Sequence, residues 1–236
     1  MAGRPTSTRR ERGSLSTEDI LDAAFAVAGT TGVDGMSVPE VAKHMGVGVT
    51  SIYWHFRKKD DLVRSMSDRA VRTVVAALPV PTTGQDVREF LENYFRQLRD
   101  VHRRNDVLTD LTWTRIRSYS LDSTHVLYHH IEVILEFMIG AGFVPLTAWN
   151  SFSTGYTFTR GVVVGERIQH LNHSPILRDT VSKLLDHDTM PILSELLSND
   201  GIMLAMVSDT EFDHGLRLIL DGIVASGDAR LRSGRG

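Results

Sequence analysis

Apolar residues recur along most of the chain at the three- and four-residue spacing of amphipathic helices. The segment 85–104 shows the pattern most clearly, since its inner stripe is Val87, Phe90, Leu91, Tyr94, Leu98 and Val101. A second stripe lies in 209–225, formed by Phe212, Leu216, Ile219, Leu220 and Ile223. We find no alternation of polar and apolar residues and no internal repeat. The pattern predicts an all-α fold.

The same periodicity divides the chain into segments. Helices are predicted over 60–78, 85–104, 121–140, 145–170, 176–197 and 209–225. The proline-containing segment 78–84 is predicted to be a break, 106–116 a short irregular element, and Pro191 a break within 176–197. Residues 172–175 are predicted to be a loop, and 199–207 carry no clear pattern.

Two helix starts are marked near the N-terminus by paired caps. Ser16 has Asp19 three residues later, and Ser37 has Glu40, the spacing of a capping box. Glycines predict the ends of these helices, at Gly32 and Gly46. The inner stripe of the first helix is predicted to be Ile20, Leu21, Ala24, Val27, Ala28 and Thr31.

A third helix is predicted over 49–56, directly after the short glycine turn. Its inward face carries Val49, Ile52 and Phe56. The other side carries hydroxyls and aromatics that can meet base edges, namely Thr50, Ser51, Tyr53, Trp54 and His55. The basic exit after this helix, residues 57–59, can meet phosphates. Helix, turn and helix in this order let the second helix enter the DNA major groove. From periodicity alone, packing of the three aromatic residues 53–55 against neighbouring helices stays an alternative.

The run GVGVTSIYWHFRKKDDL, together with residues 16–47, resembles the DNA-binding module of TetR-type transcriptional repressors. The resemblance covers residues 16 to about 65, and YWH in place of the commoner YYH points to the tetracycline-repressor branch. The DNA-binding residues that follow from pattern and resemblance are Ser37, Thr50, Ser51, Tyr53, Trp54, His55, Lys58, Lys59, Arg9 and Arg10. Val38 and Pro39 depart from that branch, which has polar DNA-contacting side chains there. No tetracycline operator is therefore expected.

The first fifteen residues form a basic arm. Arg4, Arg9, Arg10 and Arg12 stand against Glu11 alone, and no apolar run suggests a signal peptide. Such an arm can enter the minor groove or neutralise phosphates. The alternative is a disordered tail without a DNA role.

Two C-terminal segments extend the resemblance. Residues 154–166 and 212–223 resemble the helices that form a four-helix dimer interface in the tetracycline-repressor type of C-terminal domain. Gly155, Gly161 and Gly165 would allow close backbone approach there. A homodimer is therefore expected, because two-fold half-sites need two recognition helices. The alternative is that both helices pack only within their own chain.

The resemblance also implies a small-molecule pocket between the middle helices. The candidates are aromatic residues with a few polar groups: Tyr94, Leu98, Trp113, Phe137, Phe152, Tyr156 and Arg160. They favour an apolar or aromatic inducer, although each could equally be ordinary core. Arg160 could pair with an anionic ligand or form a salt bridge across the dimer.

No metal, cofactor or catalytic residue is assigned. The magnesium-liganding His and Glu of tetracycline-binding family members do not carry over: Thr109 lies near the His position, and Gly165 stands at the Glu position with Glu166 one step away. His125, His129, Glu132 and Glu136 share an arc of about 60° on one helix. A metal site there stays open, but a solvated polar face is favoured. None of the common nucleotide-binding or hydrolase motifs occurs.

Composition limits the possible classes of protein further. The 236 residues include 42% hydrophobic residues and no cysteine, which excludes disulfides and thiolate zinc sites. The net charge of −3 argues against a general polyanion binder, since basic residues concentrate in the arm and after the recognition helix. No apolar run reaches transmembrane length, so no membrane partner is expected. The expected location is the bacterial cytoplasm, with the protein associated with the nucleoid.

The sequence thus predicts a homodimeric repressor released from a palindromic double-stranded DNA operator by an inducer. The expected parts are a basic arm (1–15), a helix-turn-helix DNA-binding domain of three helices (16–65), a larger helical ligand-binding and dimerisation domain (66–227) and a tail (228–236). One alternative is a small-molecule-binding protein or enzyme with a vestigial helix-turn-helix. Another is an architectural DNA binder, which would show steep salt dependence and little sequence preference.

Overall fold

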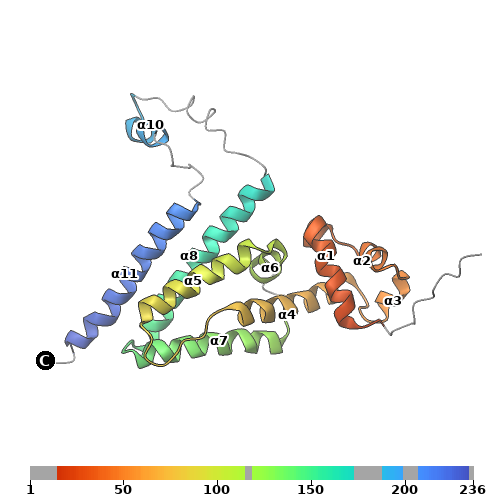
Figure 1. The fold of residues 1–236 in the computed structure, drawn as a ribbon, viewed down its shortest axis with the longest axis horizontal. Coiled ribbons are helices and arrows are strands. Elements are labelled where there is room, and N and C mark those ends of the chain that lie inside the picture. Colours follow the sequence, from red (N-terminus) through yellow and green to blue (C-terminus); the bar gives the residue numbers. More distant parts are fainter. Residues whose placement is uncertain (1–14, 115–118, 173–187, 199–206, 234–236) are drawn as a thin grey trace, which may run out of the picture.

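The computed structural model describes residues 15–114, 119–172, 188–198 and 207–233, and every regular element in these ranges is a helix. The elements in chain order are α1 (Thr17–Gly35), α2 (Val38–Met45), α3 (Val49–Tyr53), α4 (Lys59–Ala77), α5 (Val87–Arg103), α6 (Asp106–Thr109), η1 (Asp110–Thr114, a π-helical turn), α7 (Leu121–Gly140), α8 (Pro145–Asn172), α10 (Pro191–Ser198) and α11 (Asp209–Ser233). Figure 1 shows α1–α3 as a small head at one end, joined by α4 to a larger body of α5 to α11.

The head forms where its local sequence signals predict it. Both capping boxes are present, because the Ser16 and Ser37 hydroxyls accept hydrogen bonds from the N3 backbone and the N3 carboxylates bind back. Gly32 has φ 73° and kinks α1, so that one further turn carries the helix to Gly35. Gly46 ends α2 at φ 68°, a left-handed conformation that glycine adopts without strain.

Some predicted boundaries need correction. Helix α3 ends at Tyr53 rather than at Phe56, although Phe56 is buried as predicted because a turn brings it back to the core. Thr31 is exposed, since its hydroxyl bonds to the Val27 carbonyl instead of packing in the stripe. Helix α11 continues eight residues beyond the predicted end at Ala225. Helix α10 begins at Pro191, as the predicted break requires, and most of the remainder of 176–197 lies outside the described residues.

The body packs around aromatic side chains from several helices. Helix α5 lies between α8 and α11 on one side and α4 on the other, and α7 packs on both α4 and α8. The rings of Tyr94, Phe95 and Phe152 meet at centroid distances of 5.5 to 6.0 Å. Phe90 contacts Phe137 edge-on at 5.2 Å. Such aromatic contacts add to the burial of apolar area and fix how the long helices cross.

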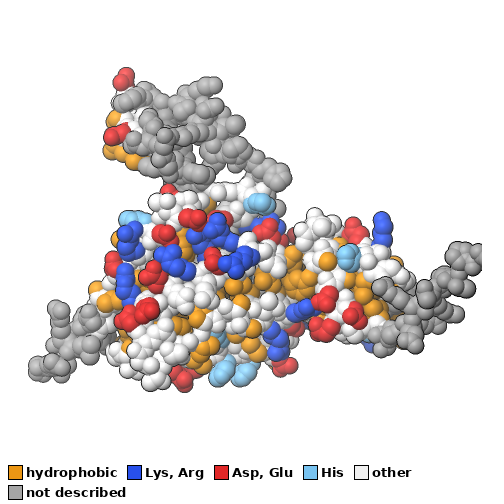
Figure 2. All heavy atoms as spheres, viewed as in Figure 1, with side chains coloured by type: hydrophobic (Ala, Val, Ile, Leu, Met, Phe, Trp, Pro, Cys, Tyr) orange, Lys and Arg blue, Asp and Glu red, His pale blue; other side chains and the backbone are white. Residues whose placement is uncertain are grey.

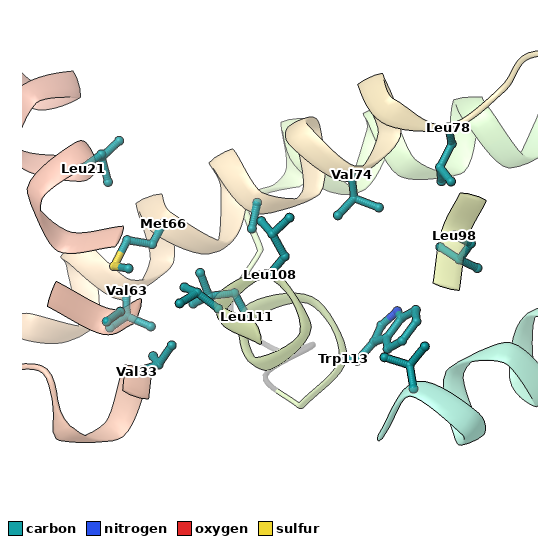
Figure 3. Close-up of a cluster of buried hydrophobic side chains, with 14 of the residues drawn as sticks. Leu21, Val33, Val63, Met66, Val74, Leu78, Leu98, Leu108, Leu111 and Trp113 are labelled. Atoms are coloured by element: carbon teal, nitrogen blue, oxygen red, sulfur yellow. The ribbon is translucent and has the colours of Figure 1, made fainter. Parts of the chain in front are cut away.

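One continuous apolar core runs from the head into the body. Helix α1 packs on α6, and α4 packs on η1. Figure 3 shows the resulting chain of side chains: Leu21, Val33, Val63 and Met66 of the head side lie next to Leu108 and Leu111, followed by Val74, Leu78, Leu98 and Trp113. The head is therefore fixed to the body by packing as well as by the single helix α4.

The glycines of α8 do not all play the predicted part. A side-chain carbon at Gly155 would lie 2.3 Å from the Phe95 ring, and one at Gly165 would lie 2.8 Å from Val207. Both glycines therefore serve close packing within the chain. Gly161 has nothing within 4 Å and lies open on the helix.

Basic residues of α5 meet acidic residues of α11. Arg88 pairs with Asp221 at 2.9 Å, and Arg96 pairs with Asp213 at 2.5 Å. Figure 2 shows these alternating basic and acidic side chains gathered over the body face formed by α5, α8 and α11. Because most of these pairs are exposed, they contribute little to stability individually and mainly fix the register of the two helices.

Candidate DNA-binding surface and ligand cavity

The second and third helices form a tight helix-turn-helix. Met36 and Val41 are both buried at the start of α2, which fixes the direction in which the chain enters. After the left-handed Gly46, the Val47 N–H donates to the Ala42 carbonyl at 3.0 Å and closes the turn. Helix α3 then buries Ile52 completely, and this anchor decides which of its faces points outward.

The outward face carries the residues predicted to contact DNA. Trp54 is 85% exposed and Tyr53 45% exposed, and Thr50, Ser51 and His55 are also exposed. Packing of Trp54 against neighbouring helices, the alternative left open by periodicity, is therefore wrong for this chain. An exposed Trp and Tyr on one short helix form an apolar surface with hydrogen-bonding groups at its edge.

Other predicted contact residues already have partners within the head. Lys59 donates to the Asp34 carbonyl at 2.8 Å, and the Ser37 hydroxyl donates to Glu40 Oε2 at 2.7 Å. His55 Nδ1 lies 3.4 Å from the Thr17 hydroxyl. Lys58 is exposed next to α3. Arg9 and Arg10 lie outside the described residues.

A small cavity of about 100 Å³ lies in the body. Its walls come from α4, α5, η1, α7 and α8 together with Tyr119, and they are Val71, Val74, Val75, Leu78, Tyr94, Leu98, His102, Thr112, Trp113, Tyr119, Leu127 and Tyr156. Figure 3 shows Val74, Leu78, Leu98 and Trp113 facing one another from three elements. None of these described lining residues carries a formal charge at neutral pH, as is usual for a small-molecule pocket.

Hydrogen bonds position the aromatic walls. The Trp113 indole N–H donates to the Tyr156 hydroxyl at 2.8 Å, and the Tyr119 hydroxyl donates to the Thr112 carbonyl. Burial raises the pKa of Tyr94, Tyr119 and Tyr156, so all three hydroxyls keep their protons. The cavity therefore offers neutral polar groups among apolar walls.

His102 is the least expected member of the lining. It is 1% exposed, and the centroid of its ring lies 3.7 Å from the centroid of the Trp113 ring. Burial lowers the pKa of His102 to about 3, so the imidazole is neutral. Nδ1 is 3.3 Å from the Thr109 hydroxyl, while Nε2 is buried without a hydrogen-bond partner among the described residues.

The structure brings together four of the seven predicted pocket residues, Tyr94, Leu98, Trp113 and Tyr156. The other three are outside the lining of this cavity. Phe137 and Phe152 pack behind it on Phe90 and Tyr94. The Arg160 guanidinium donates to the Trp113 carbonyl at 2.6 Å, so it supports the pocket wall within its own chain.

His102 and the whole α4 wall were not among the predicted pocket residues. His102 was available from the pattern, because Tyr94, Leu98 and His102 continue one stripe at four-residue steps. The α4 side chains gave no such signal, since an apolar stripe does not reveal which helix it meets. The buried Arg99 was missed too. It pairs with Glu166 and, at 2.7 Å, with Asp209, and its guanidinium lies 4.3 Å from the centre of the Phe212 ring.

A larger, polar cleft of about 870 Å³ lies beside the cavity and shares His102 with it. Its charged walls are paired with one another. Arg167 binds Asp106 at 2.6 Å and Asp110 at 3.2 Å. Although partial desolvation opposes it, the attraction of Arg103 and Arg99 lowers the pKa of Asp209. Because these charges neutralise one another, the cleft is a weaker candidate for a ligand site than the cavity.

The polar face of α7 is exposed. The rings of His125 and His129 are parallel and 6.2 Å apart, and Glu132 and Glu136 lie beyond them on the surface. Within the described ranges, no three His, Asp or Glu side chains come close enough to hold a metal ion. Nor does any helix in the described part of the chain have the length and apolar character needed to cross a membrane.

Comparison with known proteins agrees with both parts of the architecture. Residues 20–66 match the family described as bacterial regulatory proteins, tetR family, and residues 80–226 match the tetracyclin repressor-like C-terminal domain. The HTH-type transcriptional repressor Rv1353c of Mycobacterium tuberculosis is 36% identical over 216 residues, covering 90% of this chain and 82% of its own. The class D tetracycline repressor protein of Escherichia coli is 26% identical over 216 residues, covering 88% of each chain.

The fold has solved counterparts. ActR of Streptomyces coelicolor, a TetR family protein crystallised with actinorhodin, superposes with a TM-score of 0.68 at 18% identity, covering 90% of this chain and 98% of its own. At that identity the likeness concerns the fold alone. On the family matches and the helix-turn-helix geometry together, the chain belongs to the TetR family of bacterial transcriptional regulators.

Proposed function

We propose that this regulator is a homodimeric repressor that binds a palindromic operator and is released by a small apolar or aromatic inducer. In this proposal residues 16–65 read DNA with the arm 1–15, and residues 66–227 bind the ligand and dimerise. It acts in the bacterial cytoplasm on nucleoid DNA.

The exposure of Tyr53, the last residue of the anchored α3, and of Trp54 directly after it carries the proposal. A largely exposed Trp costs solubility and contributes little to the fold, so a binding role explains it best. The neighbouring Thr50 and Ser51 hydroxyls can donate to or accept from base edges, and the Trp and Tyr rings can contact thymine methyls.

Helices α8 and α11 pack against each other within the chain. Their outer faces support dimerisation. Gly161 of α8 and Gly222 of α11 have nothing within 4 Å, so another helix can approach both closely. Ile168 and Leu218 are exposed on the same two helices. A second copy related by a two-fold axis would bury them and would present two recognition helices to DNA.

Helix α4 offers a route from ligand to DNA. Its first turns pack in the head through Leu62, Val63 and Met66, and its last turns line the cavity through Val71, Val74 and Val75. These ends are joined by one rigid helix, so Lys59 and Val74 lie roughly 22 Å apart. A ligand larger than the cavity would displace α4 and change the separation of the two recognition helices, which must match half-sites about one helical turn apart.

The decisive experiment is selection of bound fragments from random DNA by the purified full-length protein at physiological salt. We expect an enriched palindrome, and its two half-sites would also establish the dimer. Tyr53→Ala and Trp54→Ala are expected to lose the enrichment, with operator affinity reduced at least tenfold, since each removes direct base contacts.

The matched control is Tyr128→Ala. Tyr128 is 60% exposed on α7, far from α3, so its removal should leave the palindrome unchanged. No enriched motif, or a motif that both α3 variants retain, would refute the assignment of α3 and leave the cavity as the functional site.

A further inference from the structure

The cavity wall contains a polar atom that none of the described residues satisfies. His102 is buried at the end of α5, and its Nε2 has no hydrogen-bond partner in the part of the chain that the structure describes. A buried, unpaired acceptor or donor carries a desolvation cost, and native proteins keep such groups rarely. An orphan of this kind in a pocket wall indicates where a ligand's polar group would be placed.

The contacts of Thr109 decide whether Nε2 is an acceptor or a donor. The Thr109 hydroxyl lies 3.3 Å from the carbonyl oxygen of His102 and 3.3 Å from Nδ1 of the same residue. A hydroxyl has one proton, so both contacts are hydrogen bonds only if it donates to the carbonyl and accepts from Nδ1–H. In that tautomer Nε2 carries a lone pair and accepts.

The position of Thr109 also indicates which edge of the ring faces the cavity. Thr109 lines the polar cleft but not the cavity, whereas His102 lines both. The Nδ1 edge is thus turned to the cleft side, and Nε2 lies on the other edge of the ring. Nε2 is inaccessible to a water molecule, so a ligand in the cavity reaches it only by displacing part of the wall. Trp113 covers one face of the imidazole and holds it in place.

The rest of the lining restricts the charge of a ligand. No Asp, Glu, Lys or Arg is among the described residues of the cavity wall, so an organic ion or a metal chelate would be buried there without a counter-charge. The wall does offer an indole ring and a Tyr156 hydroxyl that accepts from Trp113 and still has its own proton to donate.

We propose that the inducer is an uncharged aromatic molecule with a hydroxyl or N–H group that donates a hydrogen bond to His102 Nε2. This inference rests on the proposed function, because it names the ligand of the same cavity. His102 would make the cavity select ligands with a hydrogen-bond donor over analogues without one. An analogue without a donor leaves Nε2 unpaired, and a site with a buried unpaired polar atom disfavours such a ligand.

The test uses three probes that differ in one group. Each is a single ring, because the cavity of about 100 Å³ is smaller than the one of about 150 Å³ that accommodates benzene, so even these probes must displace part of the wall. The probes are 4-ethylphenol, its methyl ether 4-ethylanisole, and 4-ethylbenzoate. By calorimetry on the full-length protein we expect the phenol to bind about tenfold more tightly than the ether. The benzoate should show no measurable binding.

His102→Phe should bring the phenol and the ether to equal affinity. His129→Phe, at an exposed position on α7, is the matched control and should keep the tenfold preference. Equal affinities in the unaltered protein, or a preference that survives His102→Phe, would overturn the inference.

Nitrogen-15 NMR of the histidine rings gives a readout that does not depend on a folded variant. We expect His102 in the Nδ1–H tautomer, with an Nε2 shift that moves on addition of 4-ethylphenol. In Thr109→Val, which keeps the side-chain shape, the tautomer preference and the phenol preference should both weaken. An Nε2–H tautomer in the unaltered protein would contradict the proposal.

The two proposals fail separately. If none of the probes binds while the palindrome is still enriched, the ligand inference is wrong and the repressor assignment stands. If the phenol preference appears without any operator, the chain is a small-molecule binder and the proposed repressor function is wrong.

Discussion

The head and the body use the same residue type in opposite ways. Trp54 is 85% exposed directly after α3, whereas Trp113 is 4% exposed in the cavity wall. The head core is made largely of alanines, valines and other aliphatic residues, whereas the body core contains aromatic rings in edge-on and tilted contact. A small core suffices where each helix has its own start and stop signals. The body needs a larger core because its helices are held together mainly by packing. The same core encloses the cavity.

The largest contrast is expected from removing each tryptophan. Trp113→Ala should lower the free energy of unfolding by about 3–5 kcal/mol, because it empties a buried site and removes the hydrogen bond to Tyr156. Trp54→Ala should change it by less than about 0.5 kcal/mol, as exposed substitutions do. Urea unfolding followed by circular dichroism at one fixed protein concentration measures both.

Equal losses in the two variants would break the comparison. They would mean that Trp54 packs in the folded protein as Trp113 does, and the case for α3 as a recognition helix would then lose its main support.

The next effect concerns pH and the buried histidine of the body. Burial holds the pKa of His102 at about 3, whereas the unfolded chain takes up the proton near pH 6.5. Stability from this group is therefore complete above pH 6.5 and is lost as the pH falls towards 3. Between pH 7 and pH 5 the loss should be about 2 kcal/mol.

Urea unfolding at pH 7 and pH 5 tests this pH dependence of the free energy of unfolding. In His102→Phe the part of the loss that comes from His102 should disappear. Burial and then His129 also lower the pKa of His130, so a residual slope is expected. His44→Phe, at an exposed position in the head, is the matched control. If His102→Phe lost as much unfolding free energy between pH 7 and pH 5 as the unaltered protein, His102 would not be the origin of the pH dependence.

The smallest effect is expected from the head's local signals. Ser37→Ala removes the capping box of α2, a helix of eight residues, and should cost about 1 kcal/mol. Thermal unfolding should show the loss, and Ser51→Ala, an exposed serine that caps no helix, should show none. No loss in Ser37→Ala would mean that tertiary contacts hold α2 without its cap.

These differences explain how much the sequence could predict. Both capping boxes, the left-handed Gly46 and the buried stripe of α11 could be inferred because each depends on residues within a few positions of one another. Helical periodicity likewise predicted which residues share the outer face of α3, but it left open whether the aromatic residues 53–55 are exposed or pack against neighbouring helices. Local signals thus determined the head in detail and the body only as a set of helices.

The cavity lining could be inferred only in part. Tyr94 and Leu98 lie on a predicted inner stripe, and Trp113 and Tyr156 are large aromatic residues, so all four could be chosen. Val71, Val74 and Leu78 could not, because their role depends on which helix α4 meets across the core. For the same reason Gly155 was assigned to a dimer interface, whereas the Phe95 ring occupies its space within the chain.

The shared core between head and body has a consequence for sensor engineering. Chimeric regulators are made by joining the DNA-reading part of one family member to the ligand-sensing part of another. Here the boundary near residue 65 falls inside α4, between Val63 and the cavity-lining Val71, and α6 and η1 pack against the head side as well. A transplanted head would therefore meet a foreign surface at Leu108 and Leu111. A working hybrid should exchange α6 and η1 together with the head, so that the graft brings its own complementary surface.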